Sequence, residues 1–491
     1  MARYRKKWLD HQETNFQFSL PALLWFVPTA ALLLLGARGR LEQKSPIRIG
    51  TAYFSNHAFP NQLGLNPTYT LIKSIEEELK GNRKEITLMP NDKAISAAKN
   101  YLKIDPTNNY DSPIARIATA GAEQKQKPNL VLVIMESMTA DKMGRYGNPD
   151  GLTPTLDSLA KISYSFDNTY SAGIHTHNGI FSTLYSYPAL MQQHAMKHVV
   201  LPEYTGIAKE LKKHDYQTIY FTNHDDQFDN VGGFLSANGF ETIVSEDDYP
   251  DEKVLSTLGV GDDFLFEYAV PKLNQLHKKA KPFFASLMTA SDHGPYNIPD
   301  DVGFTGKHDD IQKRIVEYAD WSIHKFLKLA QKETWFDNTI FVFIADHGNP
   351  HFSDYDMPLS YHHVPFIVHA PTLLGTPKAF DEMAGQIDVG PTLIPLMGLS
   401  HLNNTLGVDL MKHNRPYMYF SADDKYGCIS KDYFLVVRNI GTESLYHYEN
   451  EDTRNYISEK PELADSMKHY AKSMIQTAQW MLLNKKTGDQ E

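Results

Sequence analysis

Residues Asn129–Ser137 read NLVLVIMES, and Thr339–Gly348, TIFVFIADHG, repeat the pattern later in the chain. Each stretch is an apolar run that ends in polar residues, Glu136 in the first and the pair Asp346–His347 in the second. Such a run predicts a fully buried strand of a parallel sheet. Ligands of these sheets collect at the carboxyl ends of the strands. We therefore expect the two carboxylates and the imidazole to converge there as a site for a divalent cation.

Strands and helices alternate around these two stretches. This alternation predicts an α/β/α sandwich with a mostly parallel central sheet. The further strands are expected at 217–222, 282–288 and 365–370, and the helices at 153–162, 176–187, 205–213, 271–279 and 312–331. After about residue 412 the rhythm changes to closely spaced strands, which predict a small antiparallel sheet followed by a helix. These elements are expected at 417–420, 432–437, 444–448 and 461–483.

Length and composition narrow the possible classes of protein. A chain of 491 residues is long enough for one large α/β domain with attachments or for two domains. Its 22% charged and 42% hydrophobic residues are typical of a globular protein. A net charge of −11 argues against a nucleic-acid partner. The single cysteine, Cys428, excludes an internal disulfide and a four-cysteine metal cluster.

The N-terminal region carries a candidate membrane segment. Residues 14–37 contain no charged side chain and include PALLWFVPTAALLLLG, a length that suits a helix across a ~30 Å hydrocarbon core. A cleaved signal peptide is the alternative, which the long apolar run and the lack of an A-x-A site before Arg38 disfavour. We therefore predict a retained transmembrane helix. Basic residues flank both of its ends, so charge bias does not fix its orientation.

Thr176 lies in the segment SAGIHTHNGIFSTLYSYP. Gly173 permits a tight turn, and the spacing of Ile180, Phe181 and Leu184 is helical. Thr176 is thus expected at a helix N-terminus, where free N–H groups favour anions. A hydroxyl bound there to a cation can act as a nucleophile. An ordinary N-cap threonine is the alternative that this pattern leaves open.

The other candidate residues also have alternatives when each is taken alone. Glu136 is equally typical of a capping or salt-bridge carboxylate at a strand end. Asp346–His347–Gly348 is also compatible with a plain turn, because Gly348 permits one.

Histidine is abundant, with 21 residues in the chain. His293, His224 and His363 each lie next to a predicted strand, which suggests a site for an anionic group or a second cation. The sequence does not distinguish the remaining neighbours from surface residues: His175, His177, His351 and His362.

In this order and spacing, the motifs resemble the lipoteichoic acid synthase-like branch of the sulfatase and alkaline phosphatase superfamily. The stretches that carry the resemblance span roughly residues 127–400, and they are NLVLVIMES, LTPTLDSLAKISYSFDNTYSAGIHTHNGIFSTL, TIYFTNHDDQFDNVGGFLSANGF, SLMTASDHGPY, FVFIADHG and HHVPFIVHAP. The membrane-proximal AYFSNHAFPNQLGLNP resembles the linker of such proteins. The resemblance implies a phosphoglycerol or phosphoethanolamine transferase that acts on lipid head groups outside the cytoplasm.

The resemblance also implies roles for individual residues. The metal ligands would be Glu136, Thr176, Asp346 and His347, with Thr176 also forming a phosphorylated intermediate. His293 matches a catalytic histidine on the phosphate side. The head-group contacts are expected at His224, Asp226 and Phe228, with His363 as a further substrate-binding residue. A site of mostly oxygen ligands suits Mn²⁺ best, with Mg²⁺ or Zn²⁺ as alternatives.

The expected organisation follows from these assignments. It comprises a cytoplasmic N-terminus (1–13), the membrane helix (14–37), a helical connector that packs on the domain (38–125), the catalytic domain (126–411) and a C-terminal subdomain (412–491). Members of this branch carry several membrane helices, whereas one is expected here. The expected location is the cell (inner) membrane, with the catalytic domain on the extracytoplasmic or periplasmic side. The expected partners are a phospholipid head group and a glycan or lipid acceptor.

Three other functions remain as alternatives. A sulfatase needs Cys or Ser in a C/S-x-P-x-R context, and HTHNG contains neither the proline nor the arginine. A phosphodiesterase or phosphatase that passes the group to water would use the same nucleophile and metal, so the sequence does not separate it from a transferase. An inactive, membrane-anchored binding protein is disfavoured, because the full set of expected ligands is present.

Overall fold

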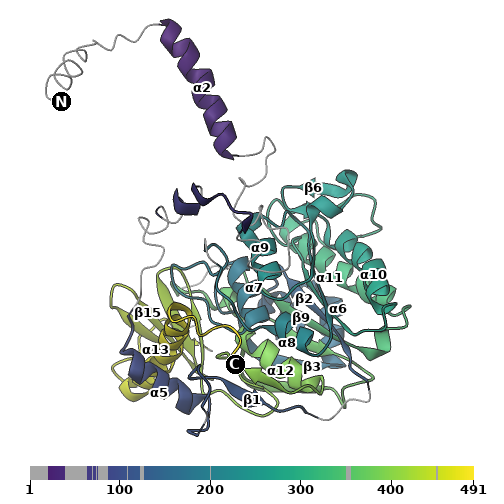
Figure 1. The fold of residues 1–491 in the computed structure, drawn as a ribbon. Helices are drawn as coiled ribbons and strands as arrows, with labels where there is room; N and C mark the ends of the chain where they lie inside the picture. The colour runs from purple at the N-terminus through teal and green to yellow at the C-terminus, as the bar shows by residue number, and fades with distance from the viewer. Residues whose placement is uncertain are drawn as a thin grey trace, which may run out of the picture. The chain divides into compact units, whose positions relative to one another are not determined.

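We analysed a computed structural model of the chain, which describes residues 20–38, 63–68, 70–72, 75, 87–107, 109–121, 126–198, 201–349, 355–448 and 452–490. The chain divides into two compact units, Met1–Arg48 and Ile49–Glu491. The first contains helix α2, Leu20–Arg38 (Figure 1). Among the described helices, none combines the length and the apolar character that a membrane crossing requires. The predicted transmembrane helix is therefore not confirmed.

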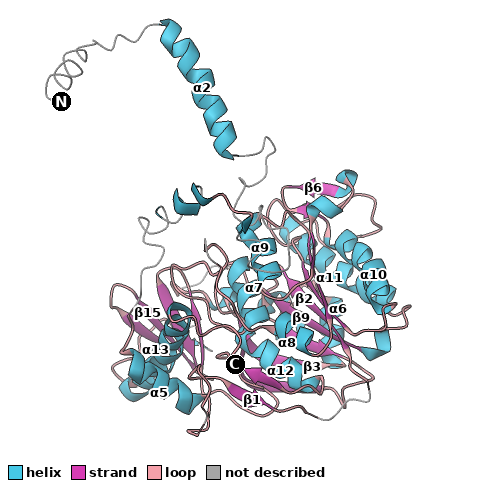
Figure 2. Cartoon of the chain, viewed as in Figure 1, coloured by secondary structure: helices cyan, strands magenta, loops and turns pink. Residues whose placement is uncertain are grey.

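An eight-stranded sheet forms the centre of the second unit, in the order β11-β3-β10-β9-β2-β8-β4-β5 (Figure 2). Neighbouring strands are parallel except at β10, which is antiparallel to both β3 and β9. The predicted mostly parallel sheet is confirmed. Its strands are β2 (Asn129–Met135), β3 (Tyr164–Tyr170), β4 (Gln217–Thr222), β5 (Thr242–Val244), β8 (Phe283–Met288), β9 (Thr339–Ala345), β10 (Phe366–His369) and β11 (Lys378–Gly385).

Strand β2 occupies the middle of the sheet, and its alternating side chains enter two separate cores. Leu130, Leu132 and Ile134 belong to one buried cluster, whereas Val131, Val133 and Met135 belong to the other. The first cluster includes residues of α7 (Thr176–Tyr185), α8 (Ile207–Lys213), α9 (Val231–Ala237) and α12 (Val389–Leu396). The second includes residues of α6 (Pro154–Lys161), α10 (Asp262–His277) and α11 (Ile311–Ala330). Helices therefore cover both faces of the sheet.

A smaller antiparallel sheet follows near the C-terminus, as predicted. Its strands are, in order, β13 (Met418–Ser421), β14 (Lys425–Ile429), β15 (Tyr433–Arg438) and β16 (Glu443–His447). Helix α13, Pro461–Leu483, has the predicted bounds and packs against α5, Asn91–Tyr101. Two short pairs complete the fold: β1 (Arg116–Ala118) with β12 (His401–Asn403), and β6 (Val254–Ser256) with β7 (Gly259–Val260).

Several elements differ from the prediction. Strand β3, YSFDNTY, and strand β11, KAFDEMAG, were not expected, because polar residues interrupt their apolar pattern. Helix α10 begins at Asp262, well before the expected start at Pro271, and carries this proline in its interior. Burial of Leu265, Phe266 and Ala269 against the core overrides the local proline signal.

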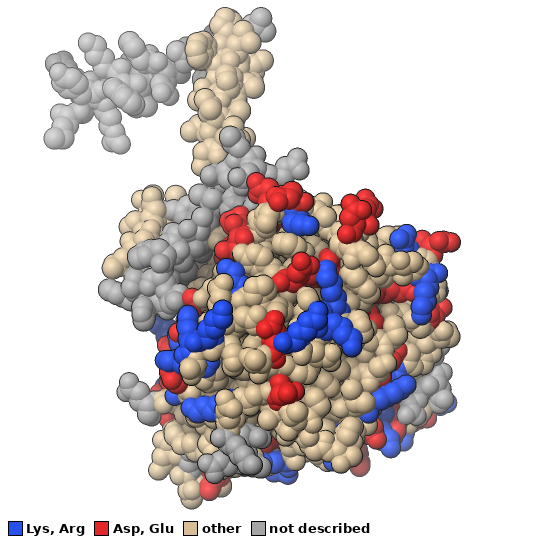
Figure 3. Space-filling model, turned by 90° about the vertical axis from the view of Figure 1, so that its right-hand side faces the viewer, with Lys and Arg blue, Asp and Glu red and all other residues tan. Residues whose placement is uncertain are grey.

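Charged side chains of both signs are scattered over the face of the domain shown in Figure 3. On the face shown in Figure 3, Lys and Arg lie interspersed with Asp and Glu. The charges that bear on function are instead the buried ones at the ends of the strands.

Candidate active site and metal centre

Glu136, Asp346 and His347 lie together at the carboxyl ends of the two central strands. The parallel register pairs Met135 with Ala345, so the next residues of the two strands, Glu136 and Asp346, become neighbours. All three side chains are buried, with exposures of 5%, 0% and 8%. Each offers a ligand atom within 4.8 Å of the others, in a group that could hold a metal ion. The predicted convergence of these three residues is present.

Main-chain donors fix one oxygen of Asp346 and leave the other free. The amides of Ser137 and His347 donate to Oδ1 at 2.8 and 2.7 Å. Oδ2 is buried without a hydrogen-bond partner. A buried carboxylate oxygen without a partner is costly. Coordination of a cation would remove that cost, so this atom supports the assignment of a metal site.

The orientation of His347 also suits a metal ligand. Its Nδ1 lies 2.7 Å from the carbonyl oxygen of Gly348 and donates its proton there. This contact leaves the lone pair of Nε2 free for a metal. Nε2 lies 3.3 Å from Asp346 Oδ2 and 3.8 Å from Glu136 Oε1.

Thr176 begins α7 and directs its hydroxyl at the same group. Its Oγ1 lies 3.4 Å from Glu136 Oε2 and 3.5 Å from His347 Nε2. The helix comes this close because Gly179 lies against the end of β9. A Cβ at Gly179 would lie 2.3 Å from the main-chain oxygen of Asp346. The fourth predicted ligand therefore joins the other three.

Two further residues hold these segments in place, and no sequence pattern predicted either role. Gln386 is fully buried and donates through Nε2 to the carbonyl oxygens of Ala345 and Asp346 at 2.8 and 2.6 Å. Its Oε1 accepts from the amide of Ala172, in the loop that leads to α7. Ser137 adopts a left-handed backbone with φ 53° and donates its hydroxyl to Glu136 Oε1 at 2.8 Å. Such strained residues cluster at functional sites.

The electrostatics of the site favour a cation. Burial, and then the neighbouring Asp346, raise the pKa of the Glu136 carboxyl well above its usual value. Two buried carboxylates side by side disfavour the ionised form of one of them. A divalent ion would balance both charges, and the donor set of three oxygens and one imidazole is compatible with Mn²⁺, Mg²⁺ or Zn²⁺.

A buried ion pair lies beside the site. Lys142 Nζ binds Asp292 Oδ2 at 2.6 Å and the carbonyl oxygen of Ser137 at 2.8 Å. Burial raises the pKa of Asp292 to about 6, and Lys142 opposes that shift. The adjacent His293, which we expect to act in catalysis, is exposed, and its Nδ1 lies 2.7 Å from the carbonyl oxygen of Gly294.

The expected head-group residues lie in the loop between β4 and α9. His224 and Phe228 form an edge-to-face ring pair at 5.2 Å, and Phe228 is 47% exposed. Burial lowers the pKa of His224. Asp226 instead packs against Gly232 in the first turn of α9. Of these three side chains, the loop exposes Phe228, whereas His224 and Asp226 are each partly buried.

His363 lies in the main-chain framework at the start of β10. Its Nε2 donates to the carbonyl oxygen of Asp167 at 2.8 Å, and its ring stacks on Tyr170. Its own carbonyl oxygen accepts from the amide of Ala140. These contacts give it a structural role, and substrate binding by His363 stays a prediction.

A second group of possible ligands lies next to Thr176 and was not predicted. The nitrogens His177 Nδ1 and His194 Nε2 approach Asp229 Oδ2 at 3.5 and 3.2 Å, and Lys197 pairs with the other oxygen of that carboxylate. The rings of His177 and His194 stack at 3.7 Å. Met196 N donates to His194 Nδ1, which leaves the proton on Nε2, and Nε2 makes no hydrogen bond of good geometry although Asp229 Oδ2 is near. Only the density of histidines in the sequence hinted at this cluster, which ties α7 to the loop before α9.

The sequence of this chain is similar to a known protein family and to several known proteins. The family description "Sulfatase" matches residues 128–399, more than half of the chain. The chain is 26% identical to a lipoteichoic acid synthase-like protein of Bacillus subtilis over 352 residues, which cover 66% of this chain and 54% of that protein. It is 22% identical to a lipoteichoic acid synthase of Staphylococcus saprophyticus over 537 residues, which cover 96% of this chain and 72% of that protein. The chain spans about half the length of the first of these relatives.

Solved structures agree with the fold. A protein in the alkaline phosphatase superfamily from Vibrio parahaemolyticus superposes with a TM-score of 0.74 at 27% identity, covering 82% of this chain and 98% of that one. The lipoteichoic acid synthase LtaP from Listeria monocytogenes superposes with a TM-score of 0.61 at 19% identity, covering 79% of this chain and 98% of that one.

Proposed function

Because this chain belongs to the sulfatase family, we propose that it is a metal-dependent transferase. It moves a phosphoglycerol or phosphoethanolamine group from a phospholipid to a glycan or lipid acceptor, through a phosphothreonine at Thr176. The observation that carries this proposal is the position of the Thr176 hydroxyl, within 3.4–3.5 Å of both Glu136 and His347. The similarity to lipoteichoic acid synthases supports the choice of substrate class.

Glu136, Thr176, Asp346 and His347 are the residues that would hold the cation, which we propose to be Mn²⁺, with Mg²⁺ or Zn²⁺ as alternatives. When bound, a divalent ion lowers the pKa of a coordinated hydroxyl and polarises phosphoryl oxygens. Gln386 holds the main-chain carbonyl group of Asp346, and the amides of Ser137 and His347 hold its carboxylate in place during turnover.

In the first step, Thr176 Oγ forms a bond to phosphorus and the bond from phosphorus to the diacylglycerol oxygen breaks. Glu136 Oε2, 3.4 Å away, gives the departing hydroxyl proton an acceptor. The diacylglycerol oxygen takes up a proton and leaves. The N-terminus of α7 faces the phosphoryl group, and its free amides favour that negative charge.

In the second step, a hydroxyl oxygen of the acceptor bonds to phosphorus, the bond from phosphorus to Thr176 Oγ breaks, and Thr176 Oγ gains a proton as the acceptor hydroxyl loses its own. His293 lies in the loop that follows β8, and we assign it to the phosphoryl oxygens in both steps. The head group would lie against His224 and Phe228, because the Phe228 side chain is 47% exposed on this loop. Asp226 and His363 complete the proposed substrate-binding set.

The proposed substrates also imply a location for the protein. A phospholipid donor implies work at the cell (inner) membrane, and a glycan or lipid acceptor implies that the catalytic domain faces the extracytoplasmic side. The uncharged residues 14–37 support membrane attachment. Protease treatment of intact cells would test this location, because a catalytic domain on the cytoplasmic side would be protected. We keep 126–411 as the proposed catalytic domain and 412–491 as its C-terminal subdomain.

A hydrolase that passes the same group to water is the second candidate function. The first step would be identical, because the nucleophile is shared. The C/S-x-P-x-R context of a sulfatase is absent around Thr176, which disfavours sulfate esters.

Product analysis would test the proposal. The full chain is incubated with vesicles of labelled phosphatidylglycerol or phosphatidylethanolamine and Mn²⁺, and both products are identified by mass. We expect diacylglycerol, a protein adduct at Thr176, and transfer to an added glycan or lipid hydroxyl. Thr176→Ala should abolish the adduct and diacylglycerol release, whereas Thr176→Ser retains a hydroxyl and should retain some turnover. Undiminished release by Thr176→Ala would refute the nucleophile, and release of the group only to water would favour the hydrolase.

A further inference from the structure

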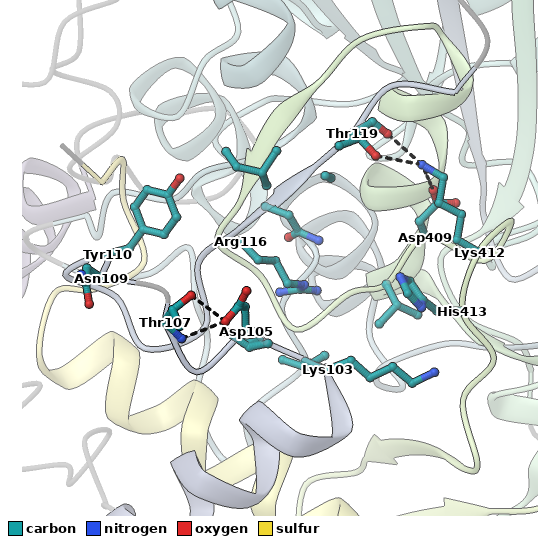
Figure 4. Close-up of a pocket in the computed structure, with 16 residues that line it drawn as sticks. Lys103, Asp105, Thr107, Asn109, Tyr110, Arg116, Thr119, Asp409, Lys412 and His413 are labelled. Carbon is teal, nitrogen blue, oxygen red and sulfur yellow. Dashed lines mark hydrogen bonds and ion pairs between the residues drawn. The ribbon is translucent and has the colours of Figure 1, made fainter.

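A cavity of about 800 Å³ opens beside strand β1 (Figure 4). His214, just before the amino end of β4, contacts Ser400, just before β12, at 3.0 Å, so the cavity belongs to the amino side of the sheet. Its cations do not converge, because Lys103 and Lys412 point away from Arg116 in Figure 4. The Arg116 guanidinium donates to three main-chain carbonyl oxygens, and Lys412 Nζ donates to another at 2.8 Å. Main-chain groups of the protein thus already bind both of these cations.

A buried carboxylate at the other edge of the sheet joins two loops. Asp262 is the first residue of α10 and is 1% exposed. Its Oδ1 accepts hydrogen bonds from the amides of Ala290 and Ser291 at 3.0 and 3.2 Å, and from Asn223 Nδ2 at 3.1 Å. Asn223 follows β4 and the two amides follow β8, its parallel neighbour. One oxygen therefore binds the loops at the carboxyl ends of two adjacent strands.

Both loops carry residues that we assign to the substrate. Asn223 directly precedes His224, and Phe228 lies further along the same loop. Ser291 is two residues before His293, which we assign to the phosphoryl oxygens. A buried side chain that binds both loops can therefore set the distance between the head-group residues and the phosphate-side histidine.

The β6–β7 hairpin fixes the first of these loops from a further direction. The amide of Val260 donates to the carbonyl oxygen of Asn223 at 3.2 Å, and Asn223 Nδ2 donates to the carbonyl oxygen of Val260 at 2.7 Å. Gly259 lies so close that a Cβ there would be 1.7 Å from the Asn223 oxygen. Asn223 is thus bound on one side by the hairpin and on the other by Asp262.

The charge of Asp262 strengthens these contacts. Burial raises the pKa of its carboxyl to about 6, and the donors from Ala290, Ser291 and Asn223 oppose that rise. The three donors therefore stabilise the ionised form. A hydrogen bond to an ionised acceptor is about twice as strong as one between neutral groups. An amide at this position would keep the shape of the side chain and hold the loops less firmly.

We propose that Asp262 is a positioning residue that fixes His224 and His293 relative to each other by binding both of their loops. This proposal rests on the proposed function, because it assumes that the two histidines contact the substrate. Asp262 acts through the main chain of Ala290 and Ser291 and through the side chain of Asn223.

The next residue of α10 provides a matched control. Asp263 is also buried, with 3% exposure, but its carboxylate is bound to α11. Tyr318 Oη donates to its Oδ1 at 2.5 Å, and Lys325 Nζ donates to its Oδ2 at 3.0 Å. Asp263→Asn therefore removes the same charge from the same helical turn as Asp262→Asn while leaving the three donors of Asp262 in place.

Steady-state kinetics of the full chain would test the positioning role. Vesicles of phosphatidylglycerol or phosphatidylethanolamine are supplied with Mn²⁺, and diacylglycerol release is measured. We expect Asp262→Asn to lower kcat/KM by about 10- to 100-fold, because small displacements of reacting groups cost this much. Asp263→Asn should lower the melting temperature by a similar amount and leave kcat/KM unchanged. Unchanged kinetics in Asp262→Asn, or an equal loss in both variants, would overturn the proposal.

Hydrogen exchange separates this role from the proposed function, because it needs no turnover. We expect faster amide exchange in both 223–230 and 290–293 in Asp262→Asn, and in neither segment in Asp263→Asn. An unaltered chain without turnover would refute the proposed function, and faster exchange in both segments would still show that Asp262 fixes the two loops. Exchange that stays unchanged, or rises in one segment only, would refute the positioning role.

A second variant covers the case in which Asp262→Asn does not fold. Asn223→Ala removes the side-chain bond from Asp262 to the first loop and leaves the amides of Ala290 and Ser291 bound. We expect faster exchange in 223–230 alone, together with a higher KM. An unchanged KM in that variant would contradict the proposal.

Discussion

The carboxyl edge and the amino side of this sheet carry buried charges of opposite sign. At the carboxyl edge, Glu136 and Asp346 lie together with an unpartnered Asp346 Oδ2. On the amino side, Arg116 is bound only by carbonyl oxygens, and a single carboxylate, Asp388, serves Arg415. Buried charge without a partner is unfavourable unless something balances it.

The two regions differ in whether the protein itself balances the buried charge. The carboxyl edge lacks positive charge within its own cluster and would be stabilised by a divalent cation. On the amino side, Asp388 pairs with Arg415 and carbonyl oxygens bind Arg116, so the protein's own groups meet each charge there. A bound cation is therefore expected to stabilise the carboxyl edge alone.

Removal of a carboxylate at the carboxyl edge should have the largest effect. Asp346→Asn keeps the shape and removes the charge, so cation affinity should fall and turnover should drop by more than about 100-fold, the upper effect of losing a residue that only supports a ligand. Calorimetric titration with Mn²⁺ and a diacylglycerol release assay would measure both. Asp381→Asn, an exposed position on β11, is the control. Unchanged cation affinity in Asp346→Asn would contradict the metal site.

A methyl group at Gly179 should misplace Thr176 without altering any ligand. Its Cβ would lie 2.3 Å from the main-chain oxygen of Asp346, so α7 must move away from β9. A shift of about 1 Å at a reacting group can cost roughly 100-fold in rate. We expect kcat to fall by about that factor in Gly179→Ala, and stability by about 1–3 kcal/mol.

The matched change for Gly179→Ala is Gly375→Ala. The nearest atom to a Cβ at Gly375 is Tyr164 Oη at 3.8 Å, an ordinary contact. That variant should keep both its kcat and its melting temperature. Full activity in Gly179→Ala would show that the close approach of α7 does not position the nucleophile.

Thermal unfolding would measure how a bound cation changes the melting temperature of the protein. A cation that binds only the native state stabilises it by about 2.7 kcal/mol at 100 times its Kd. Mn²⁺ should therefore raise the melting temperature of the unaltered chain, a chelator should reverse the change, and Asp346→Asn should show neither response. A rise with Mn²⁺ in Asp346→Asn would mean that the ion binds elsewhere.

The smallest expected effect is the contribution of a buried, neutral histidine outside both regions to the pH dependence of stability. Burial lowers the pKa of His369 to about 4 from an ordinary value of 6.5, and its Nδ1 lies 2.9 Å from Ser163 Oγ. Between these values the unfolded chain binds more protons than the native one, so the free energy of unfolding falls as the pH drops from 6.5 toward 4. This residue should contribute about 1–3 kcal/mol to that fall.

Urea unfolding at pH 7.5 and pH 5 would measure the contribution. His369→Gln should make the loss of stability between the two pH values smaller. His324→Gln, an exposed position on α11, should leave it as it is in the unaltered chain. An unchanged pH dependence in His369→Gln would contradict the assignment to burial.

The sequence predicts the parts of the fold that have strong periodicity. The strands at 129–135, 217–222 and 339–345 and the helix at 461–483 have the expected bounds, because their apolar patterns are continuous. Strand β3 and edge strand β11 were missed, since their side chains face varied surroundings and their patterns are mixed.

The site was predictable only in its central residues. Glu136, Asp346 and His347 follow apolar strands, a pattern that points to the carboxyl edge. Gln386 and the cluster around Asp229 lack any comparable signal, since their roles arise from contacts between segments far apart in the chain. The charge of Arg116 was equally hidden, because its surroundings depend on the pairing of β1 with β12.

Strand β10 is antiparallel to both of its neighbours. The connection from β9 to β10 therefore begins and ends on the same edge of the sheet. Asp346 and His347, which follow β9, thus share that edge with His363, which precedes β10. A single connection supplies two of the proposed ion ligands and one of the proposed substrate-binding residues.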